Sequence, residues 1–194
     1  MLMVSVEKAA HSTRTPGRHP QDGRPYLPAS ELIHCHMHIR EDDLTGDEIA
    51  ALLDEHLLDM HSITPAESVH AMDLDALRAD PNVTFWSLWE GEVLLGCGAL
   101  KVLENDSGEI KSMRTAEAHR RRGVAARILE HIIEQAQRIG LATLYLETGS
   151  MVEFAAARSL YERYGFEYCE PFADYVEDPN SVFMRRAFPA PFSS

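Results

Sequence analysis

The stretch Met113-Arg-Thr115-Ala-Glu-Ala-His-Arg120-Arg-Arg-Gly123-Val-Ala125 leads from a strand-like segment, through a short basic loop, into a long helix-like segment. Apolar residues recur there at helical spacing and predict an amphipathic helix over residues 122–138. The first amides of a helix have no intrahelical partners, and the helix dipole is positive at that end. Gly123 lets a ligand approach the backbone closely. The junction therefore predicts an anion-binding site.

Basic residues are concentrated at this junction. Six of the 18 lysines and arginines lie between Lys111 and Arg127, although the whole chain has a net charge of −13. Guanidinium groups bind phosphate strongly, so this concentration favours a phosphate-bearing ligand. A solvated basic helix start is the alternative. The spacing fits neither the Gly-x-x-x-x-Gly-Lys-Ser/Thr loop nor the Gly-x-Gly-x-x-Gly loop.

Seven strands and four helices are predicted around this junction. Stretches rich in β-forming residues predict strands at 36–40, 83–90, 93–102, 109–116, 141–148, 166–170 and 182–187. Helical spacing and capping signals, among them Thr64-Pro-Ala-Glu67, predict helices at 44–60, 64–77, 122–138 and 154–164. This order puts a hairpin half before a crossover half. It predicts an α/β protein whose mixed (α+β) sheet is covered by helices.

The chain is expected to divide into an extension and one domain. Residues 1–33 are rich in proline and polar side chains and predict a disordered N-terminal extension. Residues 34–188 form the predicted domain, and residues 189–194 a short C-terminal tail. The extension is interpreted as solvated, with two alternatives: a basic arm for an acidic partner, or a translation start at Met37.

Composition excludes several classes of protein. An acidic chain is a poor candidate for binding nucleic acid or an anionic membrane through its overall field. No apolar run approaches the roughly 20 residues of a transmembrane helix. The first apolar run stops at Glu7, which is too early for a signal peptide. Cys35, Cys97 and Cys169 form an odd, scattered set that favours the reducing cytoplasm over a disulfide framework.

The spacing Arg120-x-x-Gly123-x-Ala125 resembles the Arg/Gln-x-x-Gly-x-Gly/Ala loop of the GNAT family of N-acetyltransferases. The preceding strand ends at Thr115, as in that family. The segment Ala157-Arg-Ser-Leu-Tyr161-Glu-Arg-Tyr-Gly165-Phe166 resembles the family's Ala-x-x-x-Tyr-x-x-x-Gly-Phe segment. The resemblance covers residues 36–188 and implies a GNAT-like acyl-CoA N-acyltransferase fold. Such a fold has a mostly antiparallel sheet with a V-shaped splay between the fourth and fifth strands, and helices on both faces.

The resemblance implies an acetyl-CoA-dependent N-acetyltransferase. Acetyl-CoA would be a co-substrate, and the acetyl group would pass by direct attack to a primary amine of a small molecule, amino acid or peptide. Backbone groups of Met113 and Thr115 would pair with the pantetheine arm, and the amides of residues 121–126 would hold the pyrophosphate. The implied cofactor-binding residues are Met113, Arg114, Thr115, Arg120, Arg121, Arg122, Gly123, Val124, Ala125 and Ala126. This chain departs from many members by carrying Phe154 where they carry asparagine.

Acetyl transfer needs a group that takes the amine proton and an acid for the departing thiolate. The resemblance implies Tyr161 as the acid; a packed core tyrosine is the alternative. Glu109 is the candidate base because it lies six residues before Thr115 and is expected to share its strand face. A solvated strand entrance is the alternative for Glu109, and deprotonation through water remains open.

The acceptor site is expected between the first two helices and the last strands. The candidate substrate-binding residues, which are also alternative bases, are His61, Glu147 and Asp174. Trp86 and Trp89 are an odd number of positions apart and are expected on opposite strand faces, one in the core and one at the acceptor cleft.

Cys97 is predicted to be a small core residue. No metal site is expected, although His34, His36 and His38 alternate along a predicted strand, which leaves metal binding as the alternative.

Two other functions remain as alternatives to an enzyme. One is a non-catalytic coenzyme A-binding sensor of the same fold, and the other is a nucleotide-binding scaffold that uses the same helix terminus. The expected partners are a small-molecule or peptide amine, with no nucleic acid and no membrane; the resemblance also allows a homodimer.

Overall fold

The structure is a computed structural model that describes residues 36–63, 65 and 74–189. The predicted extension, most of the Thr64–Glu67 capping signal, His34 and nearly all of the C-terminal tail lie outside the described residues. None of the helices in the described ranges is long and apolar enough to cross a lipid bilayer.

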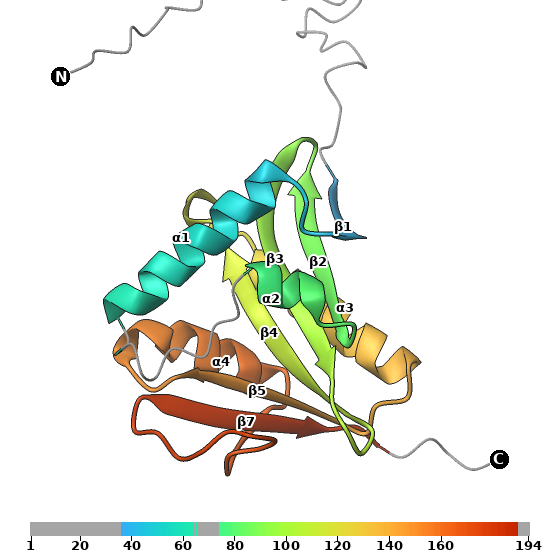
Figure 1. Cartoon of the computed structure of the whole chain (residues 1–194), viewed down its shortest axis with the longest axis vertical. Coiled ribbons are helices and arrows are strands. Elements are labelled where there is room, and N and C mark those ends of the chain that lie inside the picture. The colour runs from blue at the N-terminus through green and yellow to red at the C-terminus, as the bar shows by residue number, and fades with distance from the viewer. Residues whose placement is uncertain (1–35, 64, 66–73, 190–194) are drawn as a thin grey trace, which may run out of the picture. The chain divides into compact units, whose positions relative to one another are not determined.

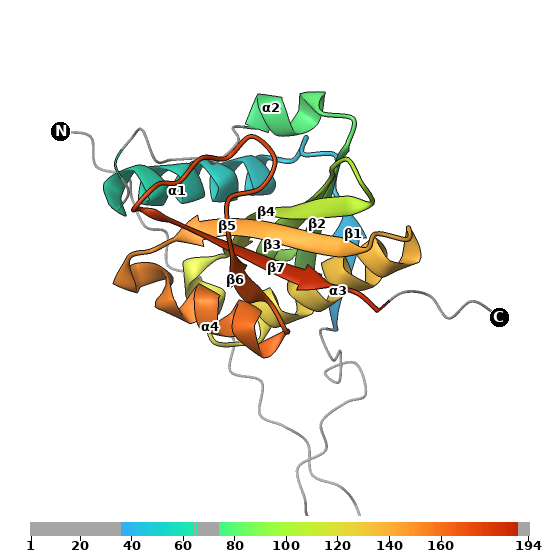
Figure 2. The same cartoon turned by 90° about the horizontal axis from the view of Figure 1, so that it is seen from below.

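A seven-stranded sheet forms the centre of the domain, in the order β1-β2-β3-β4-β5-β7-β6 (Figure 1; β6 is labelled in Figure 2). Every neighbouring pair is antiparallel except β4 and β5, which run parallel. The strands are β1 (Met37–Glu41), β2 (Val83–Glu90), β3 (Val93–Val102), β4 (Ser107–Thr115), β5 (Thr143–Gly149), β6 (Glu167–Cys169) and β7 (Ser181–Ala187). The predicted mixed sheet, with its hairpin half and its crossover half, is confirmed.

Helices cover both faces of the sheet. Helices α1 (Asp47–Ile63) and α2 (Leu74–Ala79) lie on one face, and α3 (Val124–Arg138) and α4 (Ala155–Arg163) lie on the other (Figure 2). Each face has its own apolar core, one around Leu44, Ile49 and Cys97 and the other around Ile128, Leu129 and Leu144. Cys97 is fully buried, as predicted.

Local sequence explains where α3 and α4 end. The apolar residues of α3 recur every three or four positions, and Ile128, Leu129 and Ile132 are fully buried against the sheet. Gly140 (φ +83°) and Gly165 (φ +79°) adopt the left-handed conformation just past the two helix ends, where glycine is favoured because it has no Cβ. Most of the predicted second helix lies outside the described residues; of its described part, residues 74–77 are helical, within α2 (Leu74–Ala79).

The parallel pair β4–β5 parts after a short stretch of pairing. Its register joins Ser107–Ile110 to Thr143–Leu146, and no pair follows Ile110 and Leu146. Beyond that point β4 stays with β3 as far as Thr115, while β5 stays with β7 as far as Gly149. The predicted V-shaped splay is therefore present, and it opens towards the start of α3.

A bulge in β4 overturns the expectation that Glu109 and Thr115 share a face. Their partners on β3 are Lys101 and Gly96, which lie an odd number of residues apart and so face opposite ways. The register shifts by one residue between the pairs of Cys97 and Ala99, and Ser112 has a left-handed φ of +53°. This extra residue reverses the alternation of β4. Glu109 therefore faces α1, and Thr115 faces α3.

The two tryptophans lie on opposite faces of β2, but both are buried. Trp86 packs edge-on against His131 of α3. Trp89 donates a hydrogen bond from Nε1 to Ser87 Oγ (2.7 Å) and lies under the guanidinium group of Arg40. Neither is among the residues that line the cleft described below, so the expected role of one of them at the acceptor site is not supported.

Gly96 is expected to be required for the close packing of β4 against β3. A Cβ at this position would lie 2.5 Å from the backbone oxygen of Arg114 on the neighbouring strand, which can move only by displacing β4. We expect Gly96→Ala to lower the free energy of unfolding by about 1–3 kcal/mol, measured by urea denaturation. Gly46→Ala is the matched control, because its Cβ would make only ordinary contacts, the nearest at 3.5 Å. Equal stability of the two variants would contradict this packing.

Candidate active site

Two adjoining cavities occupy the region where β4 and β5 part. The outer cavity measures about 880 Å³ and the inner one about 130 Å³. They share lining residues from α1, β4, α4 and the residue that precedes α4, namely His56, Met60, Met113, Phe154, Ala157 and Tyr161. The outer cavity reaches the basic loop before α3, and the inner cavity reaches the acidic residues of β4 and β5.

The outer cavity contains nine of the ten predicted cofactor-binding residues. Helix α3 begins at Val124, and its N-cap, Gly123, has a φ of +80° and no side chain that could cap the first amides. A Cβ at Gly123 would meet nothing within 4 Å, so this position borders open space and requires glycine for its backbone conformation alone. Arg121 is also left-handed, with a φ of +63°. Backbone amides in such turns and in a first helical turn form a cradle for an anion.

Two of the predicted cofactor-binding arginines form ion pairs with other residues of the protein. Arg122 donates to both carboxylate oxygens of Glu90 at 2.9 Å, and it is not among the residues lining the outer cavity. Arg114 lines the outer cavity, but its guanidinium group binds Glu55 (2.8 Å) and Asp59 on α1. Arg120 and Arg121 both line the cavity and can contact an anion at the cradle. Arg120 also forms an exposed ion pair with Glu117 at 4.0 Å, and such an exposed pair holds a side chain only weakly.

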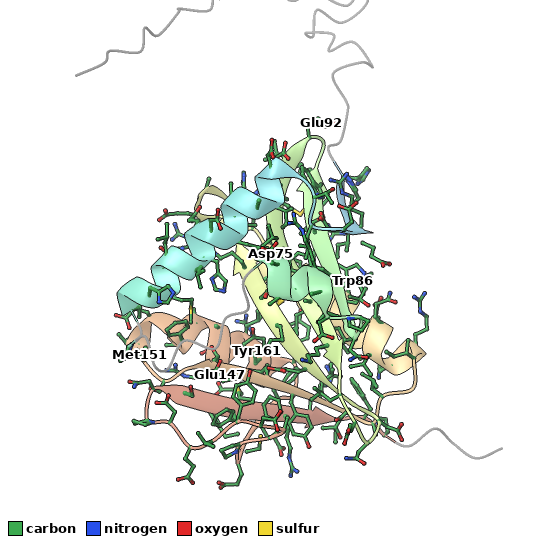
Figure 3. All side chains as sticks on the ribbon, in the orientation of Figure 1. Asp75, Trp86, Glu92, Glu147, Met151 and Tyr161 are labelled. Atoms are coloured by element: carbon green, nitrogen blue, oxygen red, sulfur yellow. The ribbon has the colours of Figure 1, made fainter. Side chains whose placement is uncertain are left out.

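Tyr161 lies at the boundary of the two cavities. It is 7% exposed and packs edge-on against Phe166. Burial raises the pKa of its phenol above the ordinary value, and the negative charge of Glu147 raises it further. Figure 3 shows Tyr161 and Glu147 close together beside α4 and β5. The phenol therefore stays protonated at neutral pH and can donate a proton.

Glu109 lies in the inner cavity and is 4% exposed. Its Oε1 accepts hydrogen bonds from Lys111 Nζ (2.8 Å) and from the Tyr175 hydroxyl (2.7 Å). Glu147 also lines this cavity and accepts a hydrogen bond from Ser181 Oγ at 2.7 Å. The cavity thus brings two of the predicted acidic residues together, one from each of the parting strands.

The other predicted acceptor residues lie elsewhere. His61 is exposed in the last turn of α1 and does not line either cavity. Asp174 borders a separate hollow of about 1080 Å³ between the β3–β4 and β6–β7 loops. A further hollow of about 580 Å³ lies beside the latter loop, away from Tyr161. Among the described residues, no group of three or more His, Cys, Asp or Glu side chains could hold a metal ion.

His56 is the cleft residue that sequence reasoning missed. It lines both cavities, and its Nδ1 is buried without a hydrogen-bond partner in the described part of the chain. Burial lowers the pKa of its imidazole to about 4, with a further contribution from the positive charge of Arg114. The available signal was a histidine within the apolar stripe of α1, between Leu53 and Met60.

Phe154 fills the position where many GNAT members carry asparagine. Its ring lies so close to Gly149 that a Cβ there would approach the ring at 2.3 Å. Phe154 also lines both cavities. At the boundary of the cavities it therefore supplies an apolar wall in place of a polar amide.

The comparisons with known proteins agree with this geometry. Residues 49–166 match the model of the acetyltransferase (GNAT) family. The chain is 59% identical over 150 residues to the uncharacterized N-acetyltransferase YsnE of Bacillus subtilis, covering 77% of this chain and 99% of that protein. It is 52% identical over 146 residues to the uncharacterized N-acetyltransferase YedL of Escherichia coli, covering 75% and 91%.

Solved structures share the fold. A Bacillus subtilis acetyltransferase in complex with CoA superposes with a TM-score of 0.57 at 18% identity, covering 79% of this chain and all (100%) of that chain. The chain described here belongs to the GNAT acetyltransferase family. It is an N-acetyltransferase that depends on an acyl-coenzyme A.

The three consecutive arginines before α3 are expected to differ in their effect on coenzyme A binding. Arg120→Ala and Arg121→Ala each remove a cation from the outer cavity, and we expect each to raise the Kd for coenzyme A about 5- to 10-fold. Arg122→Ala is the matched control and is expected to change the Kd less than about twofold, since this side chain binds Glu90. Isothermal titration calorimetry measures all three. An equal loss in all three variants would contradict the placement of these side chains.

Neutral His56 is expected to make stability depend on pH. Its pKa is about 4 in the folded protein and near 6.5 when unfolded, so the unfolded chain binds the extra proton first as the pH falls. This contribution is complete above pH 6.5 and is lost as the pH falls towards 4, by up to about 3 kcal/mol. Urea denaturation of wild type and His56→Leu across this range measures the difference. His61→Leu, an exposed histidine of the same helix, should keep the wild-type slope; identical slopes in all three proteins would refute the assignment.

Proposed function

We propose that the protein transfers the acetyl group of acetyl-CoA to a primary amine of a small molecule, an amino acid or a peptide. The observation that carries this proposal is the position of Tyr161, which lines both the cavity with the amide cradle and the cavity with the carboxylates. A thioester whose diphosphate occupies the cradle would end beside this phenol. An amine that enters the inner cavity would meet it there.

The reaction that these residues support is direct attack. The amine nitrogen forms a bond to the thioester carbonyl carbon, and the carbon–sulfur bond breaks. Glu109 takes the proton from the amine, and Tyr161 gives a proton to the departing thiolate. The inner cavity measures about 130 Å³, which is a few water volumes and admits the acetyl group with the head of an amine rather than a large acceptor.

Residues around the gap between β4 and β5 support the binding of acetyl-CoA. The edge of β4 from Lys111 to Thr115 has lost its partner strand β5, and its backbone groups are suited to pairing with an extended pantetheine arm. Amides of residues 121–126 and the side chains of Arg120 and Arg121 would hold the diphosphate. Phe154 would contact the arm through its ring, without the hydrogen bonds that an asparagine provides.

Thiol release from acetyl-CoA across a panel of amines, amino acids and peptides tests the proposal. Tyr161→Phe is expected to lower the turnover rate about 100-fold or more while leaving the Kd for coenzyme A within about twofold, because it removes only the proton donor. Tyr164→Phe is the matched control, since its hydroxyl binds Glu130 outside the cavities.

Two outcomes would contradict this proposal. Binding of acetyl-CoA without thiol release for any acceptor would favour the sensor that the sequence left open. An unchanged rate in Tyr161→Phe would remove the phenol from the mechanism.

A further inference from the structure

A closed triangle of hydrogen bonds surrounds one oxygen of Glu109. Lys111 Nζ donates to Glu109 Oε1 at 2.8 Å and to the Tyr175 hydroxyl at 3.1 Å, and that hydroxyl donates to the same Oε1 at 2.7 Å. The side chains of Lys111 and Glu109 are 10% and 6% exposed. The ion pair is therefore shielded from water. Charges attract each other more strongly in the protein interior than in water, because the dielectric constant is lower there.

The second oxygen of Glu109, Oε2, takes no part in this triangle of hydrogen bonds. Both donors converge on Oε1, and Oε2 has no hydrogen-bond partner among the described residues. Oε2 is also not fully buried, since it is absent from the fully buried polar atoms that lack a partner. Glu109 itself lines the inner cavity. One oxygen is thus fixed by protein donors, while the other can meet a molecule in the cavity.

The two donors reach Glu109 from different parts of the chain. Lys111 lies two residues further along β4 on the same face, before the bulge at Ser112. Tyr175 comes from the loop between β6 and β7, where its ring packs against Phe172 (5.0 Å between centroids) and Phe183 (5.5 Å). These aromatic contacts hold the phenol in place independently of its hydrogen bond.

The other charged and titratable groups around Glu109 come from every neighbouring element. Lys101 of β3 lies directly opposite in the ladder and forms its own ion pair with Asp80 at 2.8 Å. The remaining groups are Glu147 of β5, Tyr161 of α4, His56 of α1 and Asp174 of the β6–β7 loop, whose charge acts on Lys101. Lys111 is thus the cation that contacts Glu109 directly.

We propose that Lys111 and Tyr175 are positioning residues that hold Oε1 of Glu109 and thereby direct its Oε2 at the acceptor amine. This inference rests on the proposed function, in which Glu109 takes the amine proton. Hydrogen bonds from two donors offset the cost of burying this carboxylate and fix its orientation. With Oε1 fixed in the triangle, the proton from the attacking nitrogen is taken up at Oε2 and then passes to solvent when the product leaves.

Carbon-13 NMR titration of glutamate side-chain carboxyl groups tests this proposal without any acceptor. The Glu109 signal is assigned by its loss in Glu109→Gln. In Tyr175→Phe, which keeps the ring and removes one donor, the midpoint of that titration is expected to rise by about one pH unit. In Lys111→Met it is expected to rise further, and in Lys111→Arg to stay near the wild-type value, because the charge is restored. Tyr168→Phe is the control, since its hydroxyl binds Glu162 on the surface.

The same variants are then assayed for thiol release against pH. The acid limb of kcat/KM should move to higher pH in Tyr175→Phe and Lys111→Met, in step with the NMR midpoints, while the KM for acetyl-CoA stays unchanged. Unmoved midpoints and an unmoved acid limb, with only a lower rate or lower stability, would show a merely structural role and overturn the proposal. Absence of thiol release by the wild type would instead refute the proposed function, while the NMR result would still report on the triangle.

Discussion

The chemistry of this protein depends on the point where β4 and β5 stop pairing. Each strand is held by its other neighbour, β4 by β3 and β5 by β7, so the two diverge after Ile110 and Leu146. A strand edge inside a protein needs partners for its amides and carbonyls. The edge of β4 is therefore open to an extended ligand, and the cavities on either side of Tyr161 exist because the strands part.

Charge is distributed unevenly along the cleft. The chain carries a net charge of −13, yet the loop before α3 combines arginines with the positive end of a helix dipole. The other end of the cleft carries Glu109 and Glu147. Under the proposed function, a phosphate-bearing carrier and an amine would occupy opposite ends of the cleft, and Tyr161 lines both cavities. The net charge of the whole chain therefore does not indicate the local charge at either end of the cleft.

Sequence reasoning predicted the parts of the site that depend on local pattern. The junction of β4, basic loop and α3 is contained in one continuous stretch, with Gly123 required at the helix start, and nearly all of its predicted residues line the outer cavity. The strand order followed from alternation and turn signals. The central sheet was therefore predictable to within a few residues at each strand end.

The features that could not be predicted from the sequence depend on contacts between distant segments or on an irregular backbone. The bulge at Ser112 has no glycine to mark it, so the alternation predicted for Glu109 and Thr115 was wrong. His56 rather than His61 faces the cleft because of the rotation of α1 about its axis, which packing decides. The hydrogen bond from Tyr175 to Glu109 spans 66 residues and depends on how the β6–β7 loop packs.

A crystal structure of the protein with coenzyme A bound tests the central claim most directly. We expect the diphosphate to accept hydrogen bonds from the amides at the start of α3, the pantetheine arm to pair with β4 beyond Ile110, and the sulfur to lie beside the Tyr161 hydroxyl. Coenzyme A bound in the hollow between the β3–β4 and β6–β7 loops, with the gap between β4 and β5 left empty, would contradict the claim.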